Sequence, residues 1–240
     1  MDPLFSLPVA GLWQAYAASN AMGKIIVVLQ VVISVVVWSV MIGKRGDLRR
    51  TDVAARHYRR LFSASPALLD LYFQRKRSSN PLMEIYTRAC DKLVALLAPG
   101  PGGLTSASLE GRTLPAGKMA LVKGVAEEAL SDQLIAVDSH MWLLAIGSSL
   151  TPLIGLLGTV WGILDAFQAM GAKGSALLSD VAPGLSSALL TTVVGLVVAI
   201  PSAAGYNILL EKTRRIGAFL DGFTDELLGR LQDEFGGDPR

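Results

Sequence analysis

Two apolar stretches decide the fold: GSSLTPLIGLLGTVWGILDAF at residues 147–167 and VAPGLSSALLTTVVGLVVAIPSAAGYN at residues 181–207. They lie within uncharged runs that cover residues 139–164 and 181–210. An α-helix needs roughly 20 apolar residues to cross the hydrocarbon layer of a membrane. Each stretch is therefore long enough to predict one transmembrane helix.

A third uncharged run, residues 25–43, is rich in valine and isoleucine. The chain is 51% hydrophobic and only 18% charged, which is too apolar for an ordinary soluble domain of this length. The sequence therefore predicts an all-α integral membrane protein with three transmembrane helices. An apolar stripe continues through residues 216–231, so long helices are expected to extend from the membrane into the cytoplasm. A helix over residues 114–141 is expected to run straight into the second transmembrane helix.

The distribution of positive charge predicts the orientation. Residues 44–139 carry fifteen Lys and Arg, whereas Lys24 is the one basic residue before the first run. Cytoplasmic loops of membrane proteins carry this excess of basic residues, so the N-terminus is expected outside and the C-terminus inside. The expected order is an external amphipathic segment (1–24), transmembrane helix 1 (25–43), a cytoplasmic helical region (44–138), transmembrane helix 2 (139–168), a short external connection (169–180), transmembrane helix 3 (181–210) and a cytoplasmic helix (211–240).

Composition argues against several kinds of function. The formal net charge is +2 and the basic residues are interleaved with acids, so no nucleic-acid partner is expected. The single cysteine, Cys90, has no neighbouring Cys or His cluster, so neither a metal site nor redox chemistry is expected. The three runs also show no internal repeat of the kind from which solute transporters are built.

Small residues recur at helical spacing in the second and third runs. Three lines follow this spacing: Gly147, Thr151 and Gly155; Gly158, Gly162 and Ala166; and Ser187, Thr191, Gly195 and Ala199. Such stripes let transmembrane helices approach closely, within one subunit or between subunits. Because two helices carry several of these faces, a homo-oligomeric ring is expected.

The second and third runs contain hydroxyl side chains but no Asp, Glu, Lys or Arg. Asp165 stands at the outer end of the second run, and counting residues places Thr159 and Thr192 near one depth. A hydroxyl can bond to its own helix or give an oxygen to a cation, but it cannot carry a proton's charge as a carboxylate does. Any titrating carboxylate must therefore come from another chain.

The two stretches resemble the corresponding helices of the MotA/TolQ/ExbB family of proton channels. The shared elements are a proline followed by GLLGTVWGI at 155–163, an Ala-Phe pair at 166–167, VAPG at 181–184, a threonine two residues before VGL, AIP at 199–201 and YN at 206–207. MotA has four spans, so the order of three spans with a large loop after the first is more similar to TolQ and ExbB. The resemblance is strong over these two helices and extends to the whole chain in outline.

The resemblance implies a subunit of an ion-driven motor in the bacterial inner membrane, with its N-terminus in the periplasm, and no enzyme activity. Such subunits form a pentamer around a dimer of a single-span protein similar to TolR or ExbD, whose membrane aspartate supplies the missing carboxylate. The transported ion is H⁺ or Na⁺, with no cofactor, and membrane lipid is a further expected contact. By position, Thr159 and Thr192 match the threonines that face the partner aspartate, and we add Thr191 and Ser187 to the expected ion pathway.

The other expected site residues shape and pack the two helices. They are Pro152, Gly155, Gly158, Gly162, Pro183, Gly184, Gly195 and Pro201. Asp165 has two interpretations, either a charge that attracts cations at the outer mouth of the pathway or a solvated charge at a helix end.

One position departs from the family's usual pattern. Where relatives have a glutamate in APG-x-x-E-A-L, this chain has APGLSSAL, with Ser187 at the acidic position. Ser187 either contributes to a hydroxyl-rich path suited to sodium, or fills a small packing position in a proton-driven complex. The alternative function is a non-conducting membrane scaffold with the same fold. The sequence leaves open the coupling ion, the partner, the ring size and the choice between a TolQ-like and an ExbB-like role.

Overall fold

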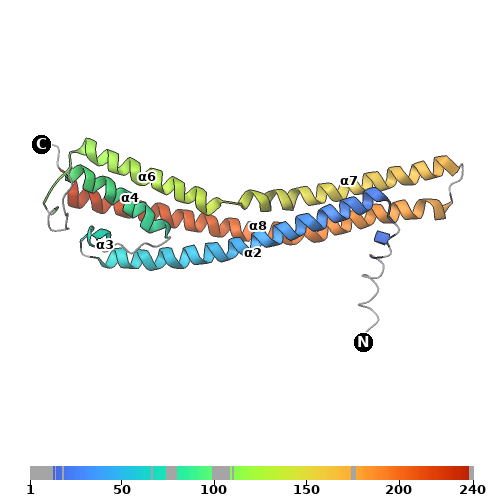
Figure 1. Ribbon diagram of the computed structural model, residues 1–240, viewed down its shortest axis with the longest axis horizontal. Coiled ribbons are helices and arrows are strands. Elements are labelled where there is room, and N and C mark those ends of the chain that lie inside the picture. Colours follow the sequence, from blue (N-terminus) through green and yellow to red (C-terminus); the bar gives the residue numbers. More distant parts are fainter. Residues whose placement is uncertain are drawn as a thin grey trace, which may run out of the picture. The chain divides into compact units, whose positions relative to one another are not determined.

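The computed structural model describes residues 13, 15–17, 19–65, 67–73, 80–98, 109, 111–173 and 177–237. Its helices, in chain order, are α2 (Ala21–Ala64), α3 (Asp70–Phe73), α4 (Pro81–Leu97), α6 (Ala116–Asp138), α7 (Met141–Lys173) and α8 (Leu178–Phe235) (Figure 1). Three helical stretches are long and apolar enough to cross a membrane. They are Ala21–Ala64, Ala116–Ala172, which includes α6 and most of α7, and Val181–Phe235. The expected all-α fold with three transmembrane helices is confirmed.

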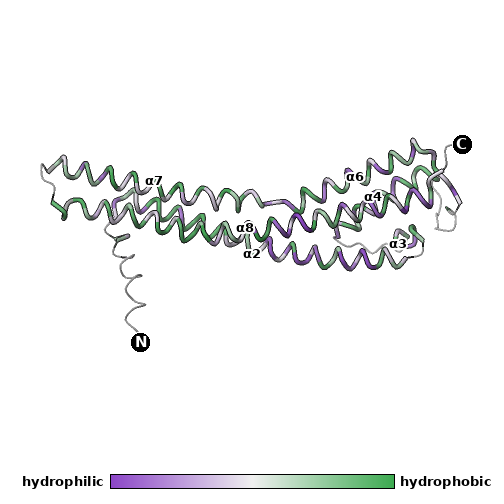
Figure 2. Tube along the Cα trace, turned by 180° about the vertical axis from the view of Figure 1, so that it is seen from behind, coloured by the Kyte–Doolittle hydropathy of each residue, from purple (hydrophilic) through white to green (hydrophobic). Residues whose placement is uncertain are grey.

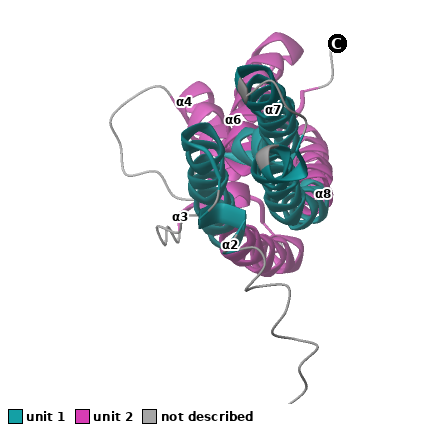
Figure 3. Ribbon diagram, turned by 90° about the vertical axis from the view of Figure 1, so that its right-hand side faces the viewer, with its two compact units in different colours: residues 1–44, 140–210 teal, residues 45–139, 211–240 magenta. Residues whose placement is uncertain are grey.

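The chain divides into two compact units (Figure 3). Residues 1–44 and 140–210 form the first, here called the membrane unit, and residues 45–139 and 211–240 form the second, the charged unit. Hydrophobic residues are concentrated in α7 and in the adjoining parts of α2 and α8, as Figure 2 shows. Helices α2 and α8 each contribute to both units, so each continues beyond its apolar run. The boundaries expected for the individual segments stay predictions.

Within the membrane unit, α2 packs along one stripe of its surface. Ile26, Gln30 and Val37 are buried and follow helical spacing, whereas Val28 and Val35 on other faces are exposed. Asn20 caps the start of α2, because its side-chain oxygen accepts a hydrogen bond of 2.7 Å from the Gly23 amide. Helix α2 therefore has one buried, protein-facing stripe, while bulky apolar side chains on its other faces are exposed.

The N-terminal amphipathic segment falls largely outside the described residues, which lack 1–12, 14 and 18. Two aromatic residues of this segment, Trp13 and Tyr16, are described, and their ring centroids lie 5.8 Å apart. The external position and amphipathic character of this segment stay predictions.

The helix expected over residues 114–141 is broken before the second apolar run. Helix α6 ends at Asp138 and α7 begins at Met141. Between them His140 has a backbone φ of 65°, in the left-handed region that ends a right-handed helix. The expectation of a continuous helix was therefore wrong, because apolar periodicity on both sides of a turn cannot reveal the turn itself.

The charged unit is built around an aromatic cluster of Tyr58, Phe62, Tyr86 and Phe223. Edge-to-face contacts join Phe62 to Phe223 with ring centroids 5.0 Å apart, and Phe62 to Tyr86 at 5.9 Å. The Tyr86 hydroxyl donates a hydrogen bond to the carbonyl of Leu68, which satisfies a polar group inside the core. The cluster thus joins α2, α4 and α8.

Helix α8 buries a long stripe in this unit, as its sequence predicts. The buried members are Ile216, Leu220, Phe223, Leu227, Leu231 and Phe235. Their spacing of three or four residues gives one face of a helix.

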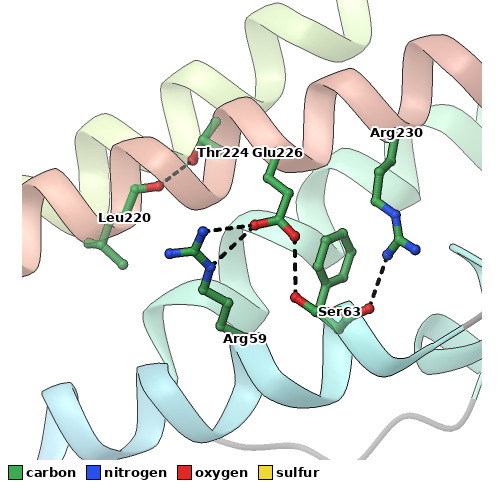
Figure 4. Close-up of polar contacts among 7 residues, drawn as sticks. Arg59, Ser63, Leu220, Thr224, Glu226 and Arg230 are labelled. Carbon is green, nitrogen blue, oxygen red and sulfur yellow. Dashed lines mark hydrogen bonds and ion pairs between the residues drawn. The ribbon is translucent and has the colours of Figure 1, made fainter.

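Polar contacts secure the rim of this core. Glu226 receives hydrogen bonds from Arg59, at 3.1 Å, and from the Ser63 hydroxyl, at 3.3 Å, while Arg230 donates to the Phe62 carbonyl at 3.0 Å (Figure 4). Surface ion pairs of this kind contribute up to about 1 kcal/mol each. The stability of the charged unit therefore comes chiefly from the apolar core.

The core can be tested through Cys90, which is the chain's single cysteine. Its side chain is fully buried, and burial raises the pKa of the thiol, so Cys90 should react with alkylating reagents only after local unfolding. Phe223→Ala removes a fully buried ring and is expected to lower the free energy of unfolding of the charged unit by about 3–5 kcal/mol. The alkylation rate of Cys90 in the detergent-solubilised full chain should rise accordingly.

The matched control is Phe73→Ala, because Phe73 is 38% exposed in the same unit. Its substitution should leave the alkylation rate close to wild type. Equal rates for Phe223→Ala and wild type would show that the aromatic cluster does not hold this unit together.

Candidate functional site

Helices α7 and α8 meet through their smallest residues. A Cβ added to Gly162 would lie 2.8 Å from the Ala188 side chain and 2.8 Å from the Gly184 carbonyl oxygen, both on α8. A Cβ on Gly155 would lie 3.1 Å from the Thr191 carbonyl oxygen. Any larger side chain would push the helices apart, so glycine is required by the close approach of the backbones.

The contacts define an antiparallel register. Along α7, Gly162 meets Ala188, Gly158 meets Thr191, and Thr151 lies beside Gly195. Gly155, Gly158 and Gly162, which were expected on two separate lines, thus lie on one continuous face. Gly147 lies instead against Val37 of α2. We call this continuous contact the α7–α8 seam.

The three prolines lie inside long helices. Pro152 is within α7, and Pro183 and Pro201 are within α8. Each removes one backbone donor from its helix. Their expected role in shaping the helices for ion transport stays a prediction.

The threonines of the expected pathway differ in their hydrogen bonds. Thr192 donates across the seam to the Gly155 carbonyl at 3.2 Å. Thr159 instead donates to Leu156 of its own helix at 2.6 Å, and Thr191 donates to Ala188 of its own helix at 2.8 Å. Thr191 also reaches the Gly155 carbonyl across the seam, at 3.5 Å, so both neighbouring hydroxyls of α8 contact α7 at this carbonyl.

Thr159 and Thr192 come close to one level along the seam. Thr192 contacts Gly155, which precedes Thr159 by one helical turn, or about 6 Å of rise. Both side chains are half-buried at the edge of the seam. Thr191 lies deeper, since it is completely buried.

Gln30 of α2 belongs to the same level and was not anticipated from the sequence. Its side chain is completely buried, and its amide nitrogen donates to the Thr191 carbonyl at 3.0 Å. The same nitrogen would lie 2.9 Å from a Cβ added to Gly195. The signal in the sequence was one amide in an otherwise valine-rich span, because polar residues within spans face the protein interior.

The Gln30 carbonyl oxygen Oε1 is buried without a hydrogen-bond partner among the described residues. The amide nitrogen of the same side chain lies at the Thr191 carbonyl, and the hydroxyls of Thr191 and Thr192 donate their protons to carbonyls. The seam therefore offers neutral oxygen atoms that can accept hydrogen bonds or approach a cation. No cluster of three or more His, Cys, Asp or Glu that could hold a metal occurs in the described part of the chain.

Ser187 and Asp165 lie away from this level. Ser187 is buried and its hydroxyl lies so close to Gly23 of α2 that no Cβ would fit there. Asp165 is half-buried, and its carboxylate accepts a hydrogen bond of 3.0 Å from the Asn20 amide, which also caps α2. Ser187 therefore occupies a packing position between two helices, and Asp165 is joined to the start of α2.

We predict that Gln30→Leu keeps or slightly raises stability. The buried Gln30 oxygen without a partner costs roughly 1–3 kcal/mol of stability, and leucine removes this cost. Leucine also removes the Gln30 amide donor, whose acceptor is the backbone carbonyl of Thr191 in helix α8. Thermal unfolding of the purified chain should show an unchanged or higher midpoint, while Gly195→Leu, which would crowd Gln30 and Thr151, should lower it. A strong loss of stability in Gln30→Leu would mean that the oxygen has a donor, such as a bound water.

Sequence comparison relates the chain to known proteins. The sequence pattern of the MotA/TolQ/ExbB proton channel family matches residues 103–221, which include the whole seam. The Tol-Pal system protein TolQ of Haemophilus influenzae is 29% identical over 208 residues, 84% of this chain and 86% of its own length. TolQ of Pseudomonas aeruginosa is 29% identical over 220 residues, 90% of each chain. The biopolymer transport protein ExbB of Aquifex aeolicus is 45% identical over 78 residues, 32% of this chain and 53% of its own. The chain belongs to the MotA/TolQ/ExbB proton channel family.

Proposed function

We propose that the chain is the channel subunit of an ion-driven motor in the bacterial inner membrane. Several copies form a ring around a single-span partner similar to TolR or ExbD, and ion flow through the complex does mechanical work at the cell envelope. The N-terminus lies in the periplasm and the C-terminus in the cytoplasm, in line with the basic residues after α2's apolar run.

The observation that carries this proposal is the pair of half-buried hydroxyls at the seam. Thr159 lies between exposed Leu156 and Ile163, and Thr192 lies between exposed Leu189 and Leu196. These neighbours precede each threonine by three residues and follow it by four, so they share its helix face. Each hydroxyl thus interrupts an apolar face that a further transmembrane helix would cover.

The apolar surface of the membrane unit supports assembly with other chains. Large side chains on all three helices are exposed, among them Val35 at 65% and Leu189 at 67%. Lipid covers part of such a surface, and helices of other subunits cover the rest. The small residues of the seam are already used within one chain, so the contacts between subunits are made by these larger side chains.

A carboxylate for proton transfer has to come from the partner. Within the described parts of the apolar runs 139–164 and 181–210, no Asp or Glu is present. A membrane aspartate of the partner, placed beside Thr192 and Thr159, would titrate while the threonines and seam carbonyls orient it or a water. Gln30 joins this group through the Thr191 carbonyl.

The position of Ser187 favours H⁺ over Na⁺ as the coupling ion. Its hydroxyl packs against Gly23 rather than at the level of Thr192, so it fits the interpretation of a small residue in a packing position. The sodium alternative needs Thr191, Thr192 and Gln30 to supply enough oxygens without Ser187.

The proposal predicts ion flux that depends on the Thr192 hydroxyl. The chain and the single-span protein that co-purifies with it are reconstituted into liposomes, and H⁺ and Na⁺ entry are followed with separate dyes. Thr192→Val keeps the side-chain volume but removes the hydroxyl, and it is expected to lower H⁺ flux by about tenfold, the effect of losing one or two hydrogen bonds in the transfer step. Ser187→Ala should leave flux unchanged.

Thr224→Val is the matched control, because Thr224 is buried in the charged unit and bonds to Leu220 of its own helix at 2.9 Å. It should conduct like wild type. Na⁺ flux lost in Ser187→Ala would favour the sodium path. Absence of any ion flux from the wild-type complex would favour the non-conducting scaffold.

A further inference from the structure

We propose that the charged unit holds the phosphate of an anionic phospholipid in a basic pocket between α2 and α8. The pocket has a volume of about 160 Å³ and is lined by Arg49, Arg56, Lys212 and Arg215, together with Leu48, Asp52 and Ile216. This lipid site is separate from the seam and does not depend on ion conduction.

Two of the residues that line the pocket are apolar and buried. Leu48 of α2 and Ile216 of α8 are both buried, so the two helices pack together beneath the charged side chains. The long stems of arginine and lysine then rise from a fixed base, which limits the freedom lost when they close on a ligand.

The charges around the pocket are not balanced by the chain itself. Arg56 pairs with Asp52 at 2.8 Å and Arg215 pairs with Glu211 at 2.9 Å. Among the residues that the structure describes, Arg49 and Lys212 form no ion pair. Two cations are thus left to bind an anion, and the guanidinium group of Arg49 presents the forked donors that suit a phosphate.

The place of the pocket along the helices favours a lipid phosphate over a free one. Lys212 follows the third apolar run, which ends at residue 210, by two residues. Arg49 follows the first run, which ends at residue 43, by six residues of the same helix, or about 9 Å. Lipid headgroups occupy this depth, and basic pockets between transmembrane helices on the cytoplasmic side are known to bind them.

The chain provides a control for non-specific attraction. Arg50 and Arg214 lie at nearly the same depth as Arg49 and Lys212 but do not line the pocket. General attraction to an anionic membrane should weaken equally when either pair is neutralised, because it depends on charge and depth alone. A built site should distinguish the two pairs.

The test measures binding of phosphatidylglycerol to the purified full chain in neutral detergent by native mass spectrometry. The double variant Arg49→Gln/Lys212→Gln is expected to bind this lipid about tenfold more weakly than wild type, and Arg50→Gln/Arg214→Gln to bind nearly as well. The charge-retaining variant Arg49→Lys/Lys212→Arg should recover most of the binding. Gel filtration and circular dichroism confirm that each variant is folded.

Three outcomes would overturn the proposal. One is an equal loss of lipid in both double variants, which would indicate only a general surface charge. Another is unchanged binding in Arg49→Gln/Lys212→Gln. The third is displacement of the lipid by inorganic phosphate at similar concentration, which would assign the pocket to a free anion.

Discussion

Helices α7 and α8 can lie side by side only because their facing residues are glycine, alanine and threonine. The carbonyl oxygen of Gly184 lies where a side chain on Gly162 would have to be, and the same holds for the Thr191 carbonyl and Gly155. In a membrane, water does not drive helices together, so close backbone contact supplies much of the packing energy. This close contact sets the register that brings Thr192 to Gly155 and Gln30 to Thr191.

Polar groups at the seam are almost all satisfied, with one informative exception. Thr192 bonds across the seam, and Thr191 bonds within its helix and, at 3.5 Å, to the Gly155 carbonyl across the seam, so these hydroxyl protons are occupied. The side-chain oxygen of Gln30 is left without a donor in the described structure, at a cost in stability. A residue that costs stability in a closely packed contact is a good candidate for function, since such exceptions concentrate at functional sites.

Two helices, α2 and α8, change character along their length. In the membrane unit they expose apolar side chains on several faces, as a lipid environment permits. In the charged unit the buried apolar residues of each helix form one stripe, which includes Phe62 on α2 and Phe223 on α8. Charged residues such as Arg59 and Glu226 lie at its rim. Such a change is expected where a helix passes from hydrocarbon into water. The basic pocket of Arg49 and Lys212 belongs to the charged unit.

The sequence by itself determined the membrane class, the number of apolar spans, the buried stripe of α8 and the family, because these depend on composition, periodicity and short motifs. Tertiary structure decided which faces meet. It brought Gly155, Gly158 and Gly162 of α7 onto one seam with α8, and it placed Ser187 against Gly23 and not beside Thr192. It also interrupted the helix at His140, before the second apolar run. It also brought Gln30, more than a hundred residues away in sequence, to the Thr191 carbonyl. Spacing along one helix shows which residues share a face, but the partner of that face depends on packing among helices distant in sequence.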